Sequence, residues 1–163
     1  MRWIRAKTIV QFPLQKGQMT FDIAEPGDYA LCFYEARTAK ADGNFGFEII
    51  YKPKNLIIET KEILLKPQFF KNSGVGVEFC YFHLEDVGEY TVRFQNSEDL
   101  ILKNSMLRLV RFFQKSIPIH SVEVLIKGSL PTWKKILTLV FLVFGINLMA
   151  WGIVAIFHPE MFA

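Results

Sequence analysis

The residues of this sequence that could do chemistry are few, and the densest group of them is His83, Glu85 and Asp86. A metal ion needs three or four ligands at set spacings, and no HExxH, CxxC or DxDxDG pattern accompanies this group. We therefore expect a solvated turn here and no metal site.

Nucleophilic and cofactor chemistry also lack their usual patterns. Cys32 and Cys80 have no obvious histidine partner that would activate a thiol, so we expect both to be small buried thiols inside strands. Gly74 to Gly76 lacks the Gly-Lys-Ser/Thr of a phosphate-binding loop, and there is no GxSxG motif. The sequence predicts a protein that is not an enzyme and holds no cofactor.

Composition and charge narrow the remaining classes. The 163 residues are 51% hydrophobic and 15% aromatic, which excludes a disordered chain and is enough for a dense core. The formal net charge is only +3, and the basic residues do not line one strand face with aromatic residues between them. Nucleic-acid binding is therefore not expected.

Short runs of alternating apolar and polar residues dominate residues 1–128. Successive side chains of a strand point to opposite faces, so each run predicts a strand with one buried face. Many short strands separated by Gly-, Pro- and Asn-containing turns predict an all-β fold, an antiparallel β-sandwich of the jelly-roll or Ig-like type. The faces expected to point inward carry Met19, Phe21 and Ile23; Tyr29, Leu31 and Phe33; Phe45, Phe47, Ile49 and Tyr51; Val75, Val77, Phe79 and Tyr81; Tyr90, Val92 and Phe94; and Val122, Val124 and Ile126.

Two of these strands open on the same Gly-acid-Tyr-x-apolar-x-Phe pattern, at Gly27 and at Gly88. In a sandwich, such a glycine makes a tight corner, and the tyrosine packs inward with its hydroxyl bonded to the backbone. We expect Tyr29 and Tyr90 to do this at sheet-to-sheet corners; the alternative is a pair of ligand-binding tyrosines. The stretch from Gly27 to Phe33 also resembles the GOLD domain of cargo receptors, which implies a β-sandwich followed by a C-terminal membrane span.

Ser105 to Lys115 departs from the alternation and predicts a short helix. Its apolar residues Met106, Leu109, Val110 and Phe113 follow helical spacing, and its basic residues Arg108, Arg111 and Lys115 lie on other faces. A basic amphipathic segment can rest on anionic lipid headgroups. The alternative is a helix or a distorted strand that closes one end of the sandwich and leaves its basic residues in water.

Residues 136–157 carry no charged residue. As a helix, this segment would be roughly 33 Å long, close to the ~30 Å hydrocarbon core of a bilayer. Trp133 precedes it and Trp151 lies in its last turns, as interfacial aromatic residues often do. The predicted organisation is a sandwich domain over 1–128, a basic juxtamembrane linker over 129–135, a transmembrane helix over 136–157 and a short tail over 158–163.

The charges around this segment predict its orientation. Lys134 and Lys135 abut its N-terminal end, with Lys127 further back, whereas residues 158–163 contain no Lys or Arg. The positive-inside rule then places the N-terminal domain in the cytoplasm. The first residues lack the apolar run of a signal peptide, so we expect a single-pass, tail-anchored protein. Trp133, Lys134 and Lys135 would lie at the membrane surface.

Within the apolar segment, Gly145, Asn147 and Gly152 stand out. Helical spacing brings the two glycines to one face, where a second helix can approach closely. The Asn147 amide near mid-bilayer is costly unless it is hydrogen-bonded, commonly to another helix. We expect these residues to contact another transmembrane helix; the alternative is a tolerated asparagine beside glycines at their ordinary membrane frequency.

These observations predict a non-enzymatic, membrane-anchored interaction module, an accessory subunit of a membrane protein complex. Its expected partners are the lipid bilayer and other transmembrane subunits. The alternative is a sandwich that binds a lipid or small ligand at the membrane surface. That alternative requires an apolar cavity between the two sheets.

Overall fold

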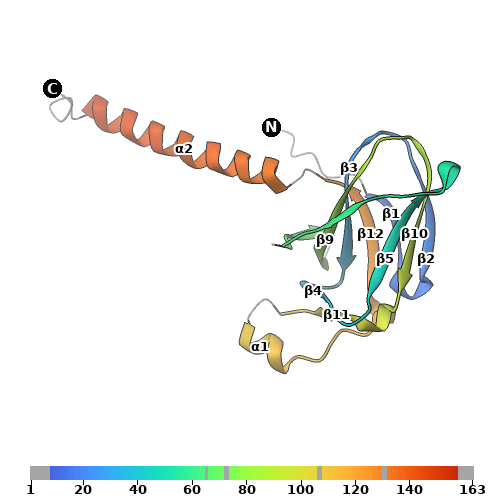
Figure 1. The fold of residues 1–163 in the computed structure, drawn as a ribbon. Coiled ribbons are helices and arrows are strands. Elements are labelled where there is room, and N and C mark those ends of the chain that lie inside the picture. The colour runs from blue at the N-terminus through green and yellow to red at the C-terminus, as the bar shows by residue number, and fades with distance from the viewer. Residues whose placement is uncertain (1–7, 65, 72–73, 106–107, 130–131, 158–163) are drawn as a thin grey trace. The chain divides into compact units, whose positions relative to one another are not determined.

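The computed structural model describes residues 8–64, 66–71, 74–105, 108–129 and 132–157. The chain divides into two compact units, Met1–Ser129 and Leu130–Ala163. The described strands and the short helix α1 (Arg108–Phe113) belong to the first unit, and helix α2 (Thr132–Phe157) belongs to the second (Figure 1). The prediction of a mostly antiparallel β domain followed by one C-terminal helix is confirmed.

The strands of the first unit form two main antiparallel sheets. Among the described residues, the larger sheet has six strands in the order β1-β12-β3-β9-β7, with β8 also pairing with β9. The smaller sheet has four strands in the order β2-β10-β5-β6, and β11 and β4 form a separate two-stranded ribbon. The strand bounds are β1 Thr8–Pro13, β2 Gln18–Ile23, β3 Gly27–Tyr34, β4 Thr38–Ala41, β5 Gly46–Tyr51, β6 Leu56–Ile57, β7 Thr60–Glu62, β8 Gln68–Lys71, β9 Gly74–Leu84, β10 Gly88–Gln95, β11 Leu100–Lys103 and β12 Glu123–Gly128.

The two main sheets bury one shared core. Phe33 and Val77 of the larger sheet and Ile49 and Val92 of the smaller sheet are all fully buried in it. The faces of β2, β3, β5, β10 and β12 that alternation predicts to point inward all lie in this core or pack against it. Aromatic rings pack against one another across it, with centroids of neighbouring rings 5.2–6.5 Å apart. These rings belong to Phe33, Phe45, Phe47, Phe79 and Phe94.

The two Gly-acid-Tyr stretches are sheet-to-sheet corners, as predicted. The first leads from β2 in the smaller sheet to β3 in the larger one, and the second leads from β9 back to β10. The Tyr29 hydroxyl donates to the Glu25 carbonyl oxygen at 2.5 Å, and the Tyr90 hydroxyl donates to the Asp86 carbonyl oxygen at 2.7 Å. Both rings are buried. Gly88 has φ 137°, a conformation that an L side chain rarely adopts.

The predicted inward face of β9 is right at Val77 and Phe79, which lie in the core, and wrong after them, at Tyr81. Leu31 pairs with Cys80 while the next residue, Cys32, pairs with Glu78, so Phe79 is an extra residue in β9. Such a bulge reverses which face the following side chains occupy. Phe82 and Leu84 therefore point into the core, and Tyr81 lies on the outer face of the larger sheet instead of the inner one.

That outer face carries a second, smaller buried cluster around Ala30, Cys32 and Leu125. Beside it, the Lys127 ammonium lies 2.9 Å from the Glu78 carboxylate and 3.8 Å from the centroid of the Phe69 ring. Lys127 is only 7% exposed. Its charge is therefore matched within the domain and does not add to the basic residues that precede α2, contrary to the sequence interpretation.

Helix α2 begins at Thr132, so residues 132–135 of the expected linker are helical. Its apolar side chains that the structure describes are all exposed, among them Phe141, Phe144 and Leu148. Within the described residues, no helix combines the length and the apolar character that crossing a membrane requires.

Candidate functional sites

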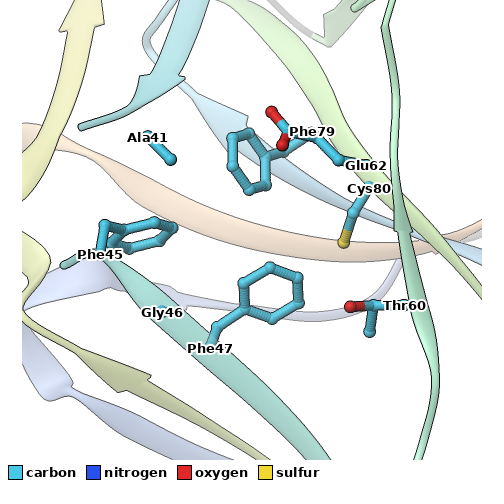
Figure 2. Close-up of a pocket in the computed structure, with 8 residues that line it drawn as sticks. All are labelled: Ala41, Phe45, Gly46, Phe47, Thr60, Glu62, Phe79 and Cys80. Atoms are coloured by element: carbon cyan, nitrogen blue, oxygen red, sulfur yellow. The ribbon is translucent and has the colours of Figure 1, made fainter. Parts of the chain in front are cut away.

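A pocket opens between the two main sheets, beside the β4–β11 ribbon. Its volume is about 270 Å³. Phe45, just before β5, and Phe47 of β5 line it from one side, and Phe79 lines it from β9 on the opposite sheet (Figure 2). The remaining lining residues are Ala41 of β4, Gly46 of β5, Thr60 and Glu62 of β7, and Cys80 of β9. Three of the eight lining residues are thus phenylalanines, and Glu62 and Thr60 supply one carboxylate and one hydroxyl.

Lys66 contacts two of the residues that line this pocket, Phe79 and Glu62, and is held by three contacts. Its ammonium stands 4.3 Å from the centroid of the Phe79 ring. It donates to the Glu62 carboxylate at 2.6 Å and to the Ala39 carbonyl oxygen at 2.8 Å. Lys66 is largely buried, with 19% of its side chain exposed, whereas the Glu62 side chain is 59% exposed. The cation is therefore held by three contacts, whereas the carboxylate that pairs with it is largely open to solvent.

The Cys80 thiol lines the pocket without offering a nucleophile. Burial is the main cause that raises the pKa of this thiol far above its usual range. The thiol is therefore protonated at neutral pH, and a thiolate is the reactive form. Cys32 is also fully buried, so both cysteines lie inside strands as the sequence predicts.

The polar side chains of His83 and Asp86, noted in the sequence, bind separate partners in the structure. The His83 ring lies 2.8 Å from the Asp28 carboxylate on the neighbouring strand, and Asp86 accepts from Lys54 at 2.7 Å. Both pairs are substantially exposed to solvent. Among the residues that the structure describes, no three His, Cys, Asp or Glu side chains are grouped so that they could hold a metal ion.

The predicted basic segment forms α1, at the end of the sandwich where β4 and β11 lie (Figure 1). Phe112 is 81% exposed, Phe113 83% and Val110 about half exposed. The side chains of Arg108 and Arg111 lie outside the described residues, and Lys115 is exposed. Val110 and Phe113 therefore leave much of the predicted apolar face exposed, whereas the side chains of Met106 and Leu109, which belong to the same face, lie outside the described residues.

The residues predicted to contact another helix lie on one continuous helix, α2. A Cβ atom added at Gly145 or Gly152 would meet no atom within 4 Å. The Asn147 side-chain amide donates to the Val143 carbonyl oxygen of its own helix at 2.9 Å. The side chains of Trp133, Lys134 and Lys135, predicted at the membrane surface, lie outside the described residues.

Two features of these sites escape sequence reasoning. The pocket joins segments from β4, β5, β7 and β9, and only the folded sheets bring those segments together. The exposure of Phe113 also escapes it, because helical spacing places Phe113 on the same predicted apolar face as Val110. Phe112 did carry a signal, since it points about 100° away from Phe113 around the helix.

Comparisons with known proteins give no further guide to these sites. No protein-family model matches the chain, and neither a curated protein nor a solved structure resembles it closely enough to count as a match.

Proposed function

We propose that this protein is a non-enzymatic interaction module anchored in a membrane, an accessory subunit of a membrane protein complex. The observation that carries the proposal is the uncharged segment 136–157 of the full sequence, which includes residues of α2 whose side chains lie outside the described part of the helix. Large exposed apolar surfaces mark sites of contact with partners or lipid. Phe141, Leu148 and Met149 are each more than half exposed, and a bilayer would cover them on every side.

The same proposal includes an orientation. The helix crosses the bilayer once, with Lys134 and Lys135 at its cytoplasmic end and the sandwich in the cytoplasm. Because Lys127 pairs with Glu78, this orientation depends on the two lysines next to the helix.

A second membrane contact is proposed at α1. Exposed Phe112 and Phe113 can enter the interfacial region of a bilayer, as aromatic residues of peripheral segments do. Between Leu100 and Val122 the chain carries Lys103, Arg108, Arg111 and Lys115 and no acidic residue, which favours an anionic lipid surface.

Membrane anchoring is tested by expressing the full chain and measuring its flotation with vesicles after alkaline carbonate washing. We expect the wild type to float. The double variant Phe144→Arg/Met149→Arg should remain in the soluble or aggregated fraction, because each central arginine costs ~2.5–3.5 kcal/mol of insertion. Val87→Arg, at a half-exposed position of the sandwich, is the matched control. Loss of the wild type from membranes on carbonate washing would contradict the anchor.

The assembly part is tested by purification from mild detergent followed by mass spectrometry. Other membrane proteins in fixed stoichiometry are expected. A chain that purifies alone under conditions that preserve other complexes would contradict a role as a subunit.

The pocket favours a second candidate function, a sandwich that binds a lipid or small ligand at the membrane surface. Ligand sites are concave, mostly apolar and supplied with a few placed polar groups. The pocket has three phenylalanine rings, with Glu62 and Thr60 as polar groups.

The strand order β1-β12-β3-β9 facing β2-β10-β5-β6 favours the jelly-roll type over the Ig-like type.

A further inference from the structure

The pocket between β5, β7 and β9 is lined by three phenylalanines, and the Lys66 ammonium contacts two of its lining residues, Phe79 and Glu62. We propose that it binds a medium-chain aliphatic carboxylate, with the chain between the phenylalanine rings and the head at Lys66. This deepens the second candidate function and rests on it, while it is independent of the membrane anchor.

The lining sets the chemistry of the ligand's body. Phe45, Phe47 and Phe79 provide aromatic walls on two opposing sheets, and their rings surround the hollow in Figure 2. The pocket volume is about 270 Å³. One water molecule takes ~30 Å³ in the liquid, so the pocket has room for roughly nine chain groups of that size. A chain of about eight to ten carbons therefore matches the pocket, and a long lipid chain would extend out of it.

The edge sets the chemistry of the head. A lysine ammonium has three donors, and among the described residues two acceptors are assigned to Lys66, on Glu62 and Ala39. An anionic oxygen can take the third donor, and the exposed Glu62 carboxylate can swing into solvent when the ligand head replaces it. The Ala39 carbonyl keeps the ammonium in position during that exchange.

The same contacts exclude a cationic ligand. Aromatic rings beside a carboxylate are the usual site for quaternary ammonium groups. Here the chain's own Lys66 ammonium already stands over the Phe79 ring and pairs with Glu62. An added cation would meet a like charge at close range.

The test uses the full chain, in vesicles or in solution as it is recovered, and decanoate carrying a photoreactive diazirine on its chain. Saturable labelling of the peptides around residues 45–47, 60–62 and 79–80 is expected, mapped by mass spectrometry. Unlabelled carboxylates should compete about fourfold better for each added methylene, up to about ten carbons, and no better beyond that. Decanol, which lacks the charge, should compete at least about tenfold less well than decanoate.

Two variants and one control assign the head and the body. Lys66→Met keeps the stem and removes the ammonium, and should remove the preference for decanoate over decanol. Ala41→Leu fills part of the pocket and should weaken decanoate labelling at least about tenfold, with thermal unfolding as a check on its fold. Lys61→Met, on β7 with 80% of its side chain exposed, should change neither.

Several results would overturn the proposal. Labelling confined to α2 or α1 would show bilayer partition only. Equal competition by hexanoate and decanoate would contradict the proposed chain length. An unchanged preference for decanoate over decanol in Lys66→Met would contradict binding of the carboxylate head at Lys66. If the chain fails to float with membranes but the pocket peptides are labelled, the anchor is wrong and the pocket assignment stands.

Discussion

The sandwich and helix α2 use the same residue types in opposite ways. In the sandwich, Leu31 and Phe33 are fully buried, whereas Phe141 and Leu148 of α2 are more than 60% exposed. The difference lies in the sequence period: alternation gives each strand one face to bury, and a helix that is apolar all round has no polar face to turn to water. The sandwich can therefore complete its own core, whereas the described apolar side chains of α2 stay exposed; in the proposed function, a bilayer or a partner helix covers them.

Removing α2 is the strongest way to test that contrast. We expect residues 1–129 to fold alone and to unfold cooperatively, with a free energy of unfolding of about 5–15 kcal/mol. The physical reason is that the core of this unit is built from its own two sheets. Circular dichroism with urea titration measures the result. An insoluble fragment, or a fragment without a cooperative transition, would show that the sandwich also relies on the apolar helix.

The buried corner tyrosines give the next largest effect. Tyr90→Ala should cost ~3–5 kcal/mol of stability, because it deletes a ring that stacks on Phe21 and Tyr51. Tyr90→Phe keeps the ring and loses the bond to the Asp86 carbonyl, worth about 1 kcal/mol. Urea titration of both variants compares the stability that the buried ring contributes with the stability that its hydroxyl contributes. Full stability in Tyr90→Ala would mean that the corner is not structural; the matched pair Tyr29→Ala and Tyr29→Phe tests the second copy.

Alternation and corner chemistry were readable from the sequence because both are local. The inward faces of β2, β3 and β10 follow from alternation, and the two tyrosine corners follow from a repeated pattern of a few residues. The bulge at Phe79 was not readable, since it depends on how β9 pairs with β3. The Lys127–Glu78 pair and the pocket with Lys66 also depend on strands that are distant in sequence.

Alkaline pH should lower the stability of the sandwich and leave the membrane association of α2 unchanged, and this effect should be smaller than that of Tyr90→Ala. Burial is the main cause that raises the pKa values of the Tyr29 and Tyr90 phenols above 10.0, with the Glu25 charge adding for Tyr29 and the Tyr51 and Asp86 charges for Tyr90. The unfolded chain loses these protons first, so the contribution of the two tyrosines to stability is constant below about pH 10 and is lost as pH rises towards the folded pKa values. The double variant Tyr29→Phe/Tyr90→Phe should show a flatter decline.

The control for that measurement is α2 itself. Segment 136–157 has no charged residue, so flotation of the full chain should not change over the same pH range. A decline in sandwich stability that begins well below pH 10, or one that is unchanged in the double variant, would assign the alkaline effect to other groups.

The smallest expected effect concerns what covers α2, lipid alone or a second helix. Gly145 and Gly152 are seven residues apart and fall within roughly 20° of each other around the helix, so they form one narrow face on which another helix can approach. Asn147 lies off that face and uses one amide proton on the Val143 carbonyl, which leaves its side-chain oxygen as an acceptor for a neighbour. An interhelical hydrogen bond is worth ~0.6–2 kcal/mol, so Asn147→Leu alone should lower co-purification of partners by about threefold to thirtyfold. The triple variant Gly145→Leu/Asn147→Leu/Gly152→Leu should lower it further, because leucines also block close approach, whereas Ile146→Leu should have no effect. Flotation with vesicles should be unchanged in all of them, since each variant keeps or increases the apolar character of α2. Full retention of partners by the triple variant would contradict a helix contact at Gly145, Asn147 and Gly152. Lipid alone would then cover α2, and assembly would proceed through the sandwich or α1.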